Sequence, residues 1–175
     1  IFAAVGDYLT KEAIAGIDYL KRVFPKIKVR FVNIIELSSV GIGNLSEDKK
    51  DQEKKRKINK LFTSRKPVIV NYHGYPNDIN SLLIHYEHPH RFFVHGYTEH
   101  GSTTTPFDMH VRNKTSRYHL AIQAIEILFR RNKIRKKQAM VGIKFFEQKL
   151  KDHKEHILTY GDDPEEIKSW KWERK

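Results

Sequence analysis

The stretch that decides the fold is IFAAVGDYLTKEAIAGIDYLKRVFPKIKVRFVNII, residues 1–35. Residues 1–5 form an uninterrupted apolar run, which predicts a buried strand. Apolar side chains then recur at helical spacing, which predicts a helix that Thr10 caps and Pro25 ends. Residues 27–35 are rich in β-branched side chains and predict a second strand. The order is therefore strand, helix, strand.

The same alternation continues along the rest of the chain. The further elements that we expect are a helix from Ser46 to Phe62, a strand within 66–75, a helix over 77–86 capped by Asn77 or Asp78, a strand over 91–97, a helix that starts at Thr115 or Ser116, and a charged helix from about 132 to 158. Apolar strands between amphipathic helices predict an α/β fold, a three-layer sandwich with a mainly parallel or mixed sheet. The length predicts a single domain, residues 1–175, with a charged helical extension from about residue 132.

Composition limits the compartment and the class of partner. Lys and Arg number 33 against 21 Asp and Glu, and the formal charge of +12 favours phosphates or acidic partners. The absence of cysteine excludes disulfides and thiolate zinc sites, in keeping with a cytoplasmic protein. No apolar run approaches the roughly 20 residues of a membrane span. Because the chain starts inside an expected strand without an initiator methionine, we interpret it as a fragment of a longer polypeptide.

Two basic segments, residues 49–60 and 130–137, raise the question of nucleic-acid binding. Neither segment interleaves aromatic side chains with its cations, and no known nucleic-acid-binding motif is present. We therefore interpret both as solvated helix faces and do not expect nucleic acid as a partner. The second segment also suits contact with an acidic partner subunit.

Eight of the ten histidines fall within residues 73–119, which raises the question of a metal site. His85, His88 and His90 are close enough in sequence to place two imidazoles near one ion. However, Pro89 prevents helical pairing of these side chains, and a zinc site needs three or four convergent ligands. We expect surface or packed histidines and no metal ligands.

Two strand-end loops that share the triplet His-Gly-Tyr form the candidate site. In parallel sheets, ligands and partners meet the loops beyond the carboxyl ends of the strands. One such loop follows the third expected strand, and the longer HGYTEHGSTTTP follows the fourth. The candidate residues of an interface or anion site are His73, Gly74, Tyr75, His95, Gly96, Tyr97, Glu99, Gly101, Ser102, Thr103, Thr104 and Thr105.

The longer loop has two physical interpretations. In the structural one, Gly96 and Gly101 permit backbone angles closed to other residues, Pro106 fixes an extended exit, and the threonine hydroxyls satisfy free amides. In the functional one, the same amides and hydroxyls form a concave anion site assisted by His95 or His100. The sequence leaves both interpretations open.

Known catalytic motifs are missing from the sequence. It contains no nucleophile elbow, Walker loop, dinucleotide-binding motif or His-Glu-x-x-His helix. Asp7, Glu99 and Asp108 are carboxylates near loops, but such groups beside histidines usually orient a neighbour. We therefore expect no catalytic or cofactor-binding residue in this chain.

Four stretches resemble the carboxyl-terminal domain of phosphoketolase. They are VGDYLTKEAIAGIDYLKRVFPKIKVRFVNIIEL (5–37), VNYHGYPNDINSLLIH (70–85), FFVHGYTEHGSTTTPFDMHVRNKTSRYHLAIQAIE (92–126) and YGDDPEEIKSW (160–170). The resemblance covers almost the whole chain. It is specific because the Gly-Tyr-x-Glu-x-Gly-Ser-Thr-Thr-Thr-Pro-Phe-Asp-Met string is long and leaves few positions open.

The resemblance implies a transketolase-like architecture and a thiamine-diphosphate enzyme, a carbon–carbon lyase of carbohydrate metabolism. Such enzymes split xylulose 5-phosphate, and often fructose 6-phosphate, with phosphate to acetyl phosphate and a shorter aldose phosphate. The resemblance also implies that thiamine diphosphate and Mg²⁺ are bound by other domains. The cofactor motif, Gly-Asp-Gly followed by a distant Asn, is missing here, and Gly6-Asp7-Tyr8 does not replace it.

The implied partners are the amino-terminal thiamine-binding domains and further subunits of a dimer or larger homo-oligomer. On this view the chain is catalytically silent alone and supports domain packing and assembly. The candidate anchors of such an interface are Tyr75, Phe92, Tyr97, Phe107 and Met109. The alternative is a regulatory module whose strand-end loops bind phosphate or a nucleotide.

Overall fold

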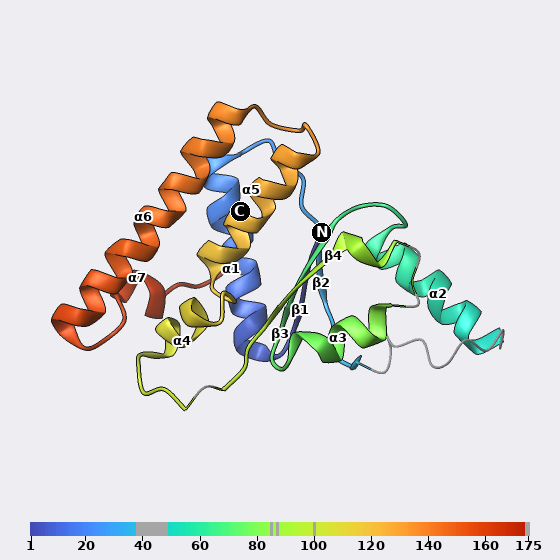
Figure 1. Ribbon diagram of the computed structural model, residues 1–175, viewed down its shortest axis with the longest axis horizontal. Helices are drawn as coiled ribbons and strands as arrows, with labels where there is room; N and C mark the ends of the chain where they lie inside the picture. Colours follow the sequence, from blue (N-terminus) through green and yellow to red (C-terminus); the bar gives the residue numbers. More distant parts are fainter. Residues whose placement is uncertain (38–48, 85, 87, 100, 174–175) are drawn as a thin grey trace.

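The fold is an α/β sandwich built on a parallel sheet (Figure 1). The computed structural model describes residues 1–37, 49–84, 86, 88–99 and 101–173. Three positions from the sequence analysis lie outside these ranges, namely the expected helix start at Ser46 and the side chains of His85 and His100. Within the described ranges, no helix is both long and apolar enough to cross a bilayer.

Four parallel strands form the sheet in the order β2-β1-β3-β4. Their bounds are β1 Phe2–Val5, β2 Phe31–Asn33, β3 Val68–Tyr72 and β4 Phe92–Gly96. Ala3 of the central strand β1 lies opposite Val32 on one side and Val70 on the other. The predicted α/β class is confirmed, and every pairing among the described strands is parallel. The second strand is shorter than the expected 27–35: its ladder with β1 covers Phe31–Asn33, and one further hydrogen bond at each end, from Phe2 N to Arg30 O and from Ile34 N to Ala4 O, closes it.

Helices cover both faces of this sheet (Figure 1). One face carries α1 (Asp7–Val23), α4 (Pro106–Arg112), α5 (Arg117–Arg130), α6 (Lys136–Tyr160) and α7 (Glu165–Lys168). The other face carries α2 (Lys49–Phe62), α3 (Pro76–Leu83) and the short 3-10 helix η2 (Pro89–Arg91). Alternate strand residues separate the two cores: Phe2 and Ala4 pack with the first group, and Ala3 packs with the second.

Three helix starts differ from the sequence predictions, and one of them is that of α6, which begins at Lys136 and not at about residue 132. Helix α1 begins at Asp7 and not after Thr10, because Gly6 caps it at φ 101°, an angle that favours glycine. Helix α3 begins at Pro76, whose fixed φ suits the first helical position, so the predicted caps Asn77 and Asp78 lie inside the helix. The predicted start of α5 is confirmed with Ser116 as its cap. The short helices α4 and α7 were not predicted.

A buried ion pair joins α1 to the start of α5. The backbone N and the Nε of Arg117 donate to Glu12 Oε2 at 2.9 and 3.0 Å, and a terminal guanidinium nitrogen donates to Oε1 at 2.6 Å. Both side chains are fully buried. Gly16 permits this close crossing, because a Cβ there would lie 3.0 Å from the carbonyl oxygen of Arg117. The buried ion pair and the close approach at Gly16 therefore help to fix how α1 and α5 pack together, along with the apolar core that they share.

We predict that Glu12→Gln strongly destabilises the fold. The substitution keeps the shape of the side chain but leaves the Arg117 guanidinium without its counterion, and breaking a buried pair costs about 3–5 kcal/mol. Urea unfolding measures the loss. The matched control is Glu155→Gln, which removes an exposed pair with Lys151 at 3.8 Å and should change stability by less than about 0.5 kcal/mol. Equal losses in the two variants would contradict the prediction.

Candidate functional site

The two His-Gly-Tyr triplets lie side by side at the carboxyl edge of the sheet. Tyr72 of β3 pairs with Gly96 of β4, and the amide of Tyr97 donates to the carbonyl oxygen of Tyr72 at 2.9 Å. A Cβ on Gly96 would lie 2.5 Å from both the carbonyl oxygen of Gly74 and Cδ of Pro76. The two loops are therefore in direct contact, and position 96 has no room for a side chain larger than that of glycine.

Aromatic and imidazole rings from α1, from the segments after β3 and β4, and from α4 contact one another at this edge. Tyr8 stacks on His110 with ring centroids 4.3 Å apart and an interplanar angle of 4°. Tyr97 contacts His110 at 5.1 Å and His73 at 5.2 Å. A hydrogen bond of 3.0 Å joins His110 Nδ1 to the hydroxyl of Thr115. Tyr8 and His110 were not among the predicted residues, because nothing local in the sequence links α1 to α4.

Three histidines of this edge, His95, His110 and His119, are neutral near pH 7. Burial lowers the pKa of His95, His110 and His119 to about 4 in each case. His95 Nδ1 donates to the carbonyl oxygen of Lys114 at 2.9 Å, and His119 Nδ1 lies 2.8 Å from the hydroxyl of Ser116. His95 therefore supplies a backbone hydrogen bond and no positive charge.

The threonine loop is held by the chain's own carboxylates. The Thr104 hydroxyl donates to Asp108 Oδ2 at 2.7 Å, and the Thr105 hydroxyl donates to Asp163 Oδ1 at 2.6 Å. Thr105 also caps α4 by accepting from the amide of Asp108 at 3.3 Å. The amide of Phe107 donates to Asp163 Oδ2 at 2.8 Å. The hydroxyls and the first amides of α4 thus have internal partners.

Asp163 brings the carboxyl-terminal tail to this loop. Its side chain is buried, and it also accepts from His153 Nε2 of α6 at 2.9 Å. Helix α6 ends at Gly161, which has a φ of 68° and turns the chain back toward α4. Neither Asp163 nor His153 was predicted as a site residue. The sequence around Asp163, Gly161-Asp162-Asp163-Pro164, is typical of a turn and does not by itself indicate a site.

The remaining candidates divide by exposure. Tyr75 is 63% exposed, and His73 and Thr103 are also exposed. Glu99 Oε1 accepts the amide of Gly101 at 3.2 Å within the loop itself. Ser102 is half-buried. Of the candidate anchors, Phe92 and Phe107 belong to the core, whereas Tyr75, Tyr97 and Met109 reach the surface at least in part.

The described residues contain no group of three or more His, Asp or Glu side chains arranged to hold a metal ion. His88, the N-cap of η2, and His90, within η2, are both exposed. His85 lies outside the described residues, so the expected absence of a metal site remains a prediction.

Comparison with known proteins identifies the family to which this chain is related. A family model described as "XFP C-terminal domain" matches residues 1–172. The chain is similar to a probable phosphoketolase of Brucella abortus, with 36% identity over 172 residues. It is similarly related to probable phosphoketolases of Chlorobaculum tepidum, with 35% identity over 173 residues, and of Nitrosospira multiformis, with 37% over 172 residues. These matches cover 98–99% of this chain and 20–21% of each relative. The chain thus spans about a fifth of the length of the curated relatives it matches.

We predict that Gly96→Ala destabilises the contact between the two loops. The added methyl group would overlap the carbonyl oxygen of Gly74 and the ring of Pro76, and such overpacking costs about 1–3 kcal/mol. Thermal unfolding of the variant measures the effect. Thr103→Ala is the control, because this side chain is exposed in the same loop, and the stability should change by less than about 0.5 kcal/mol. The prediction fails if both variants have the same melting temperature as the parent chain.

We also predict that stability falls as the pH is lowered from about 6.5 toward 4, the interval between the usual pKa of histidine and the lowered pKa of His110. In this interval the unfolded chain binds a proton that the folded chain does not, so acid favours unfolding. His110 alone should contribute about 1 kcal/mol between pH 7.5 and 5.5. Denaturant unfolding across this range measures the slope, which His110→Gln should reduce. If the free energy of unfolding depends on pH in the same way in the variant and the parent, His110 is not a neutral buried imidazole.

Proposed function

This chain belongs to the phosphoketolase family as its carboxyl-terminal domain, and from that membership we propose that it is a non-catalytic domain that supports packing and assembly of a phosphoketolase. The longer enzyme would cleave xylulose 5-phosphate or fructose 6-phosphate with inorganic phosphate, giving acetyl phosphate and an aldose phosphate. Its partners would be the thiamine-binding domains of the same protein and a second subunit. The alternative remains a regulatory module that binds phosphate or a nucleotide.

We propose that the described residues of this chain do not hold thiamine diphosphate or Mg²⁺. The stretch nearest to the cofactor motif is Gly6-Asp7-Tyr8, and it forms the start of α1. There Gly6 lies against His73, and Tyr8 is stacked on His110. These residues therefore serve to pack the carboxyl edge. We assign the cofactor to other domains of the longer protein.

The observation that carries the proposal is the position of the Asp163 carboxylate. It accepts hydrogen bonds from the Thr105 hydroxyl, the Phe107 amide and His153. In the regulatory alternative, the amides and hydroxyls of this loop must be open to an incoming anion. Because the chain's own carboxylates already bond the hydroxyls of Thr104 and Thr105 and the amide of Phe107, the arrangement favours a rigid loop whose outer surface meets another protein.

The outer surface of the edge has the composition of a protein interface. Tyr75 projects with 63% of its surface exposed, next to exposed His73 and half-buried Tyr97. Tyrosine is enriched at interfaces because it offers a large rigid contact area and one polar atom. The neutral imidazoles of His95, His110 and His119 lower the cost of covering this edge, since these three side chains would add no buried charge in need of a partner.

We predict that Tyr75→Ala in the full-length protein weakens assembly and lowers acetyl phosphate formation. Loss of a central interface tyrosine raises a dissociation constant by at least about tenfold. Analytical ultracentrifugation and an acetyl phosphate assay measure the two effects. The matched control is Tyr160→Ala on α6, where the tyrosine is 71% exposed. This control should leave both properties unchanged.

Unchanged assembly and activity in the Tyr75→Ala variant would contradict the scaffold proposal. Calorimetry with phosphate, acetyl phosphate and adenine nucleotides tests the regulatory alternative directly. Binding that Thr103→Val and Tyr75→Ala abolish would favour that alternative, whereas the scaffold proposal expects no heat from this edge.

A further inference from the structure

One side of helix α6 leaves apolar side chains exposed. In Figure 1, α6 lies along the outside of the molecule and packs against α5. Its inner side is buried at Gly142 and Phe146. On its outer side Met140, Val141 and Phe145 are 49%, 60% and 42% exposed. A helix that only faced water would carry polar residues at these positions, so the outer side is a candidate contact surface.

Close packing on α5 holds α6 in this orientation. A Cβ on Gly142 would lie 2.9 Å from Cδ1 of Ile125 in α5 and 3.1 Å from Cε2 of Phe24. The ring of Phe145 is placed edge-on to that of buried Phe146, with centroids 5.1 Å apart and an interplanar angle of 80°. The exposed apolar side chains therefore project from a rigid support.

Four residues of the outer side are spaced like the hole that a facing helix fills. Lys137, Met140, Val141 and Lys144 lie at positions i, i+3, i+4 and i+7, and in paired helices such a set surrounds one side chain of the partner. These four residues line most of a hollow of about 430 Å³. We call them, together with Phe145, the outer face of α6. The hollow suits a protruding side chain better than a flat surface.

The cations at this end of α6 have no ion-pair partner in the described part of the chain. None of the ion pairs there includes Lys136, Lys137 or Lys144. Residues 136–146 contain no Asp or Glu. Lys136 and Lys137 also lie in the first turn, where the helix dipole disfavours cations. An anionic partner would relieve this repulsion.

We propose that the outer face of α6 binds an acidic amphipathic helix from another part of the longer protein. The apolar side chains of that helix would pack on Met140, Val141 and Phe145, and one of them would enter the hollow. Its Asp and Glu residues would pair with Lys137 and Lys144, as charged residues do beside the seam of paired helices. The proposal rests on the packing role proposed above, but it concerns a different surface and different residues.

A second copy of this chain fits the outer face less well. Such a copy would offer the second half of its own α6, which exposes Leu158 and carries Asp152 and Glu155. There Asp152 accepts a hydrogen bond from Gln148 at 2.7 Å, and Glu155 lies 3.8 Å from Lys151. These two carboxylates therefore already have partners within their own helix.

The longer protein is the more suitable source of the partner helix. This chain covers 21% of the Brucella abortus relative, so most of such a protein is further sequence. A helix in the same polypeptide is present at a high effective concentration, which favours docking without a large interface. A membrane surface is flat by comparison, and it would leave the hollow between Lys137 and Lys144 unfilled.

Carbodiimide cross-linking of the full-length protein tests the chemistry of the partner. The reagent joins a lysine to a carboxylate only where the two groups are in contact, and mass spectrometry identifies the pair. We expect Lys137 and Lys144 to be joined to Asp or Glu residues outside this domain. The ion pair of Lys149 with Glu166, 3.0 Å apart, is the positive control. Lys57, exposed on α2, is the negative control.

Two results of this experiment would overturn the proposal. One is a cross-link in the positive control without any at Lys137 or Lys144. The other is a link from Lys144 to Asp152 or Glu155 of a second copy, detected by mixing isotopically labelled and unlabelled protein. That result would assign the outer face to self-association.

Thiol labelling measures how well the outer face is covered. The experiment compares Val141→Cys with Lys57→Cys in the full-length protein, and the labelled peptide is quantified by mass spectrometry. We expect a maleimide to react at position 141 at least about tenfold more slowly than at exposed position 57, because the partner helix would cover the first position. Equal rates at the two positions would overturn the proposal.

Charge reversal tests the role of the lysines. In the Val141→Cys protein, Lys137→Glu combined with Lys144→Glu should raise the labelling rate at least about tenfold. A glutamate in the first turn suits the helix dipole, so faster labelling would not reflect an unfolded α6. The control Lys55→Glu combined with Lys60→Glu makes the same change in net charge on exposed parts of α2 and should leave the rate unchanged. Equal effects of the two reversals would overturn the proposal.

Sedimentation with phosphatidylglycerol vesicles provides the last comparison. Vesicle binding by the full-length protein that Lys137→Glu combined with Lys144→Glu abolishes would assign the outer face to a membrane and overturn the proposal. The Tyr75→Ala variant leaves the outer face of α6 intact. Failure of the interface at the carboxyl edge is therefore distinguishable from failure of this proposal.

Discussion

The guanidinium of Arg117 contacts several parts of this molecule in addition to its ion-pair partner Glu12. It joins α1 to α5 through Glu12 and also lies over the ring of Phe107 in α4, at 5.2 Å, and the ring of Trp170 beyond α7, at 5.4 Å. A fully buried charge is costly unless it is paired and hydrogen-bonded. Here two hydrogen bonds from the guanidinium to Glu12 and two aromatic faces offset that cost in part, while the guanidinium nitrogen Nη1 has no hydrogen-bond partner among the described residues. The same contacts place α4 and the tail beside the carboxyl edge, so the geometry of the candidate interface depends on this residue.

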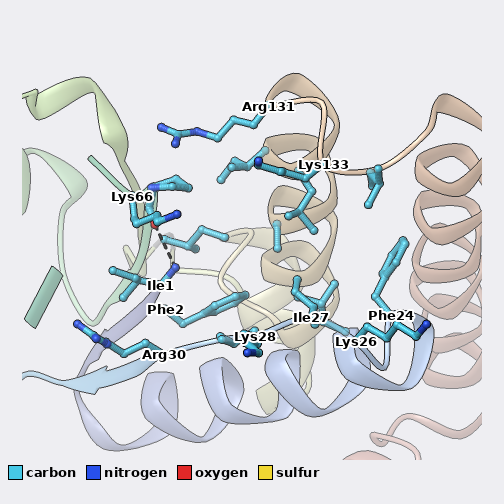
Figure 2. A pocket seen from close by; sticks show the side chains of 18 of the residues that line it. Ile1, Phe2, Phe24, Lys26, Ile27, Lys28, Arg30, Lys66, Arg131 and Lys133 are labelled. Carbon is cyan, nitrogen blue, oxygen red and sulfur yellow. Dashed lines mark hydrogen bonds between the residues drawn. The ribbon is translucent and has the colours of Figure 1, made fainter. Parts of the chain in front are cut away.

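The two edges of the sheet have opposite chemical character. At the carboxyl edge, Asp163 and Asp108 bond the threonine hydroxyls, and burial keeps the imidazole of His95 neutral. At the amino edge, Arg30 and Arg131 are bonded only to carbonyl oxygens and keep their charge. The net charge of +12 is therefore not a uniform property of the surface. The polar groups of the carboxyl edge are bonded within the chain. At the amino edge, Arg30 and Arg131 lie beside apolar side chains (Figure 2) and have no ion-pair partner among the described residues.

The sequence predicted what depends on local pattern. Apolar runs and helical spacing gave the order of strands and helices, and the parallel sheet followed from that order. The start of α1 at Gly6 was missed because its cap is a backbone conformation and not a hydroxyl side chain. Helices α4 and α7 are too short for periodicity to reveal them. The twelve candidate residues were chosen because they follow the strand ends in the sequence, and two of them, His95 and Gly96, lie in β4 itself. The contact of Thr105 with Asp163 spans 58 positions and has no local signal.

The outer face of α6 escaped the sequence analysis for a related reason. Helix α6 carries apolar residues on two sides, and exposed Val141 is followed directly by buried Gly142, so the apolar pattern marks no single side. The basic run 130–137 was interpreted as a solvated helix face, but its members point to different places. Arg131 donates to a carbonyl oxygen at the amino edge, whereas Lys137 lies on the outer face of α6. Which cations and apolar side chains share one surface is decided by the packing of α6 on α5, and that contact leaves no pattern along the sequence.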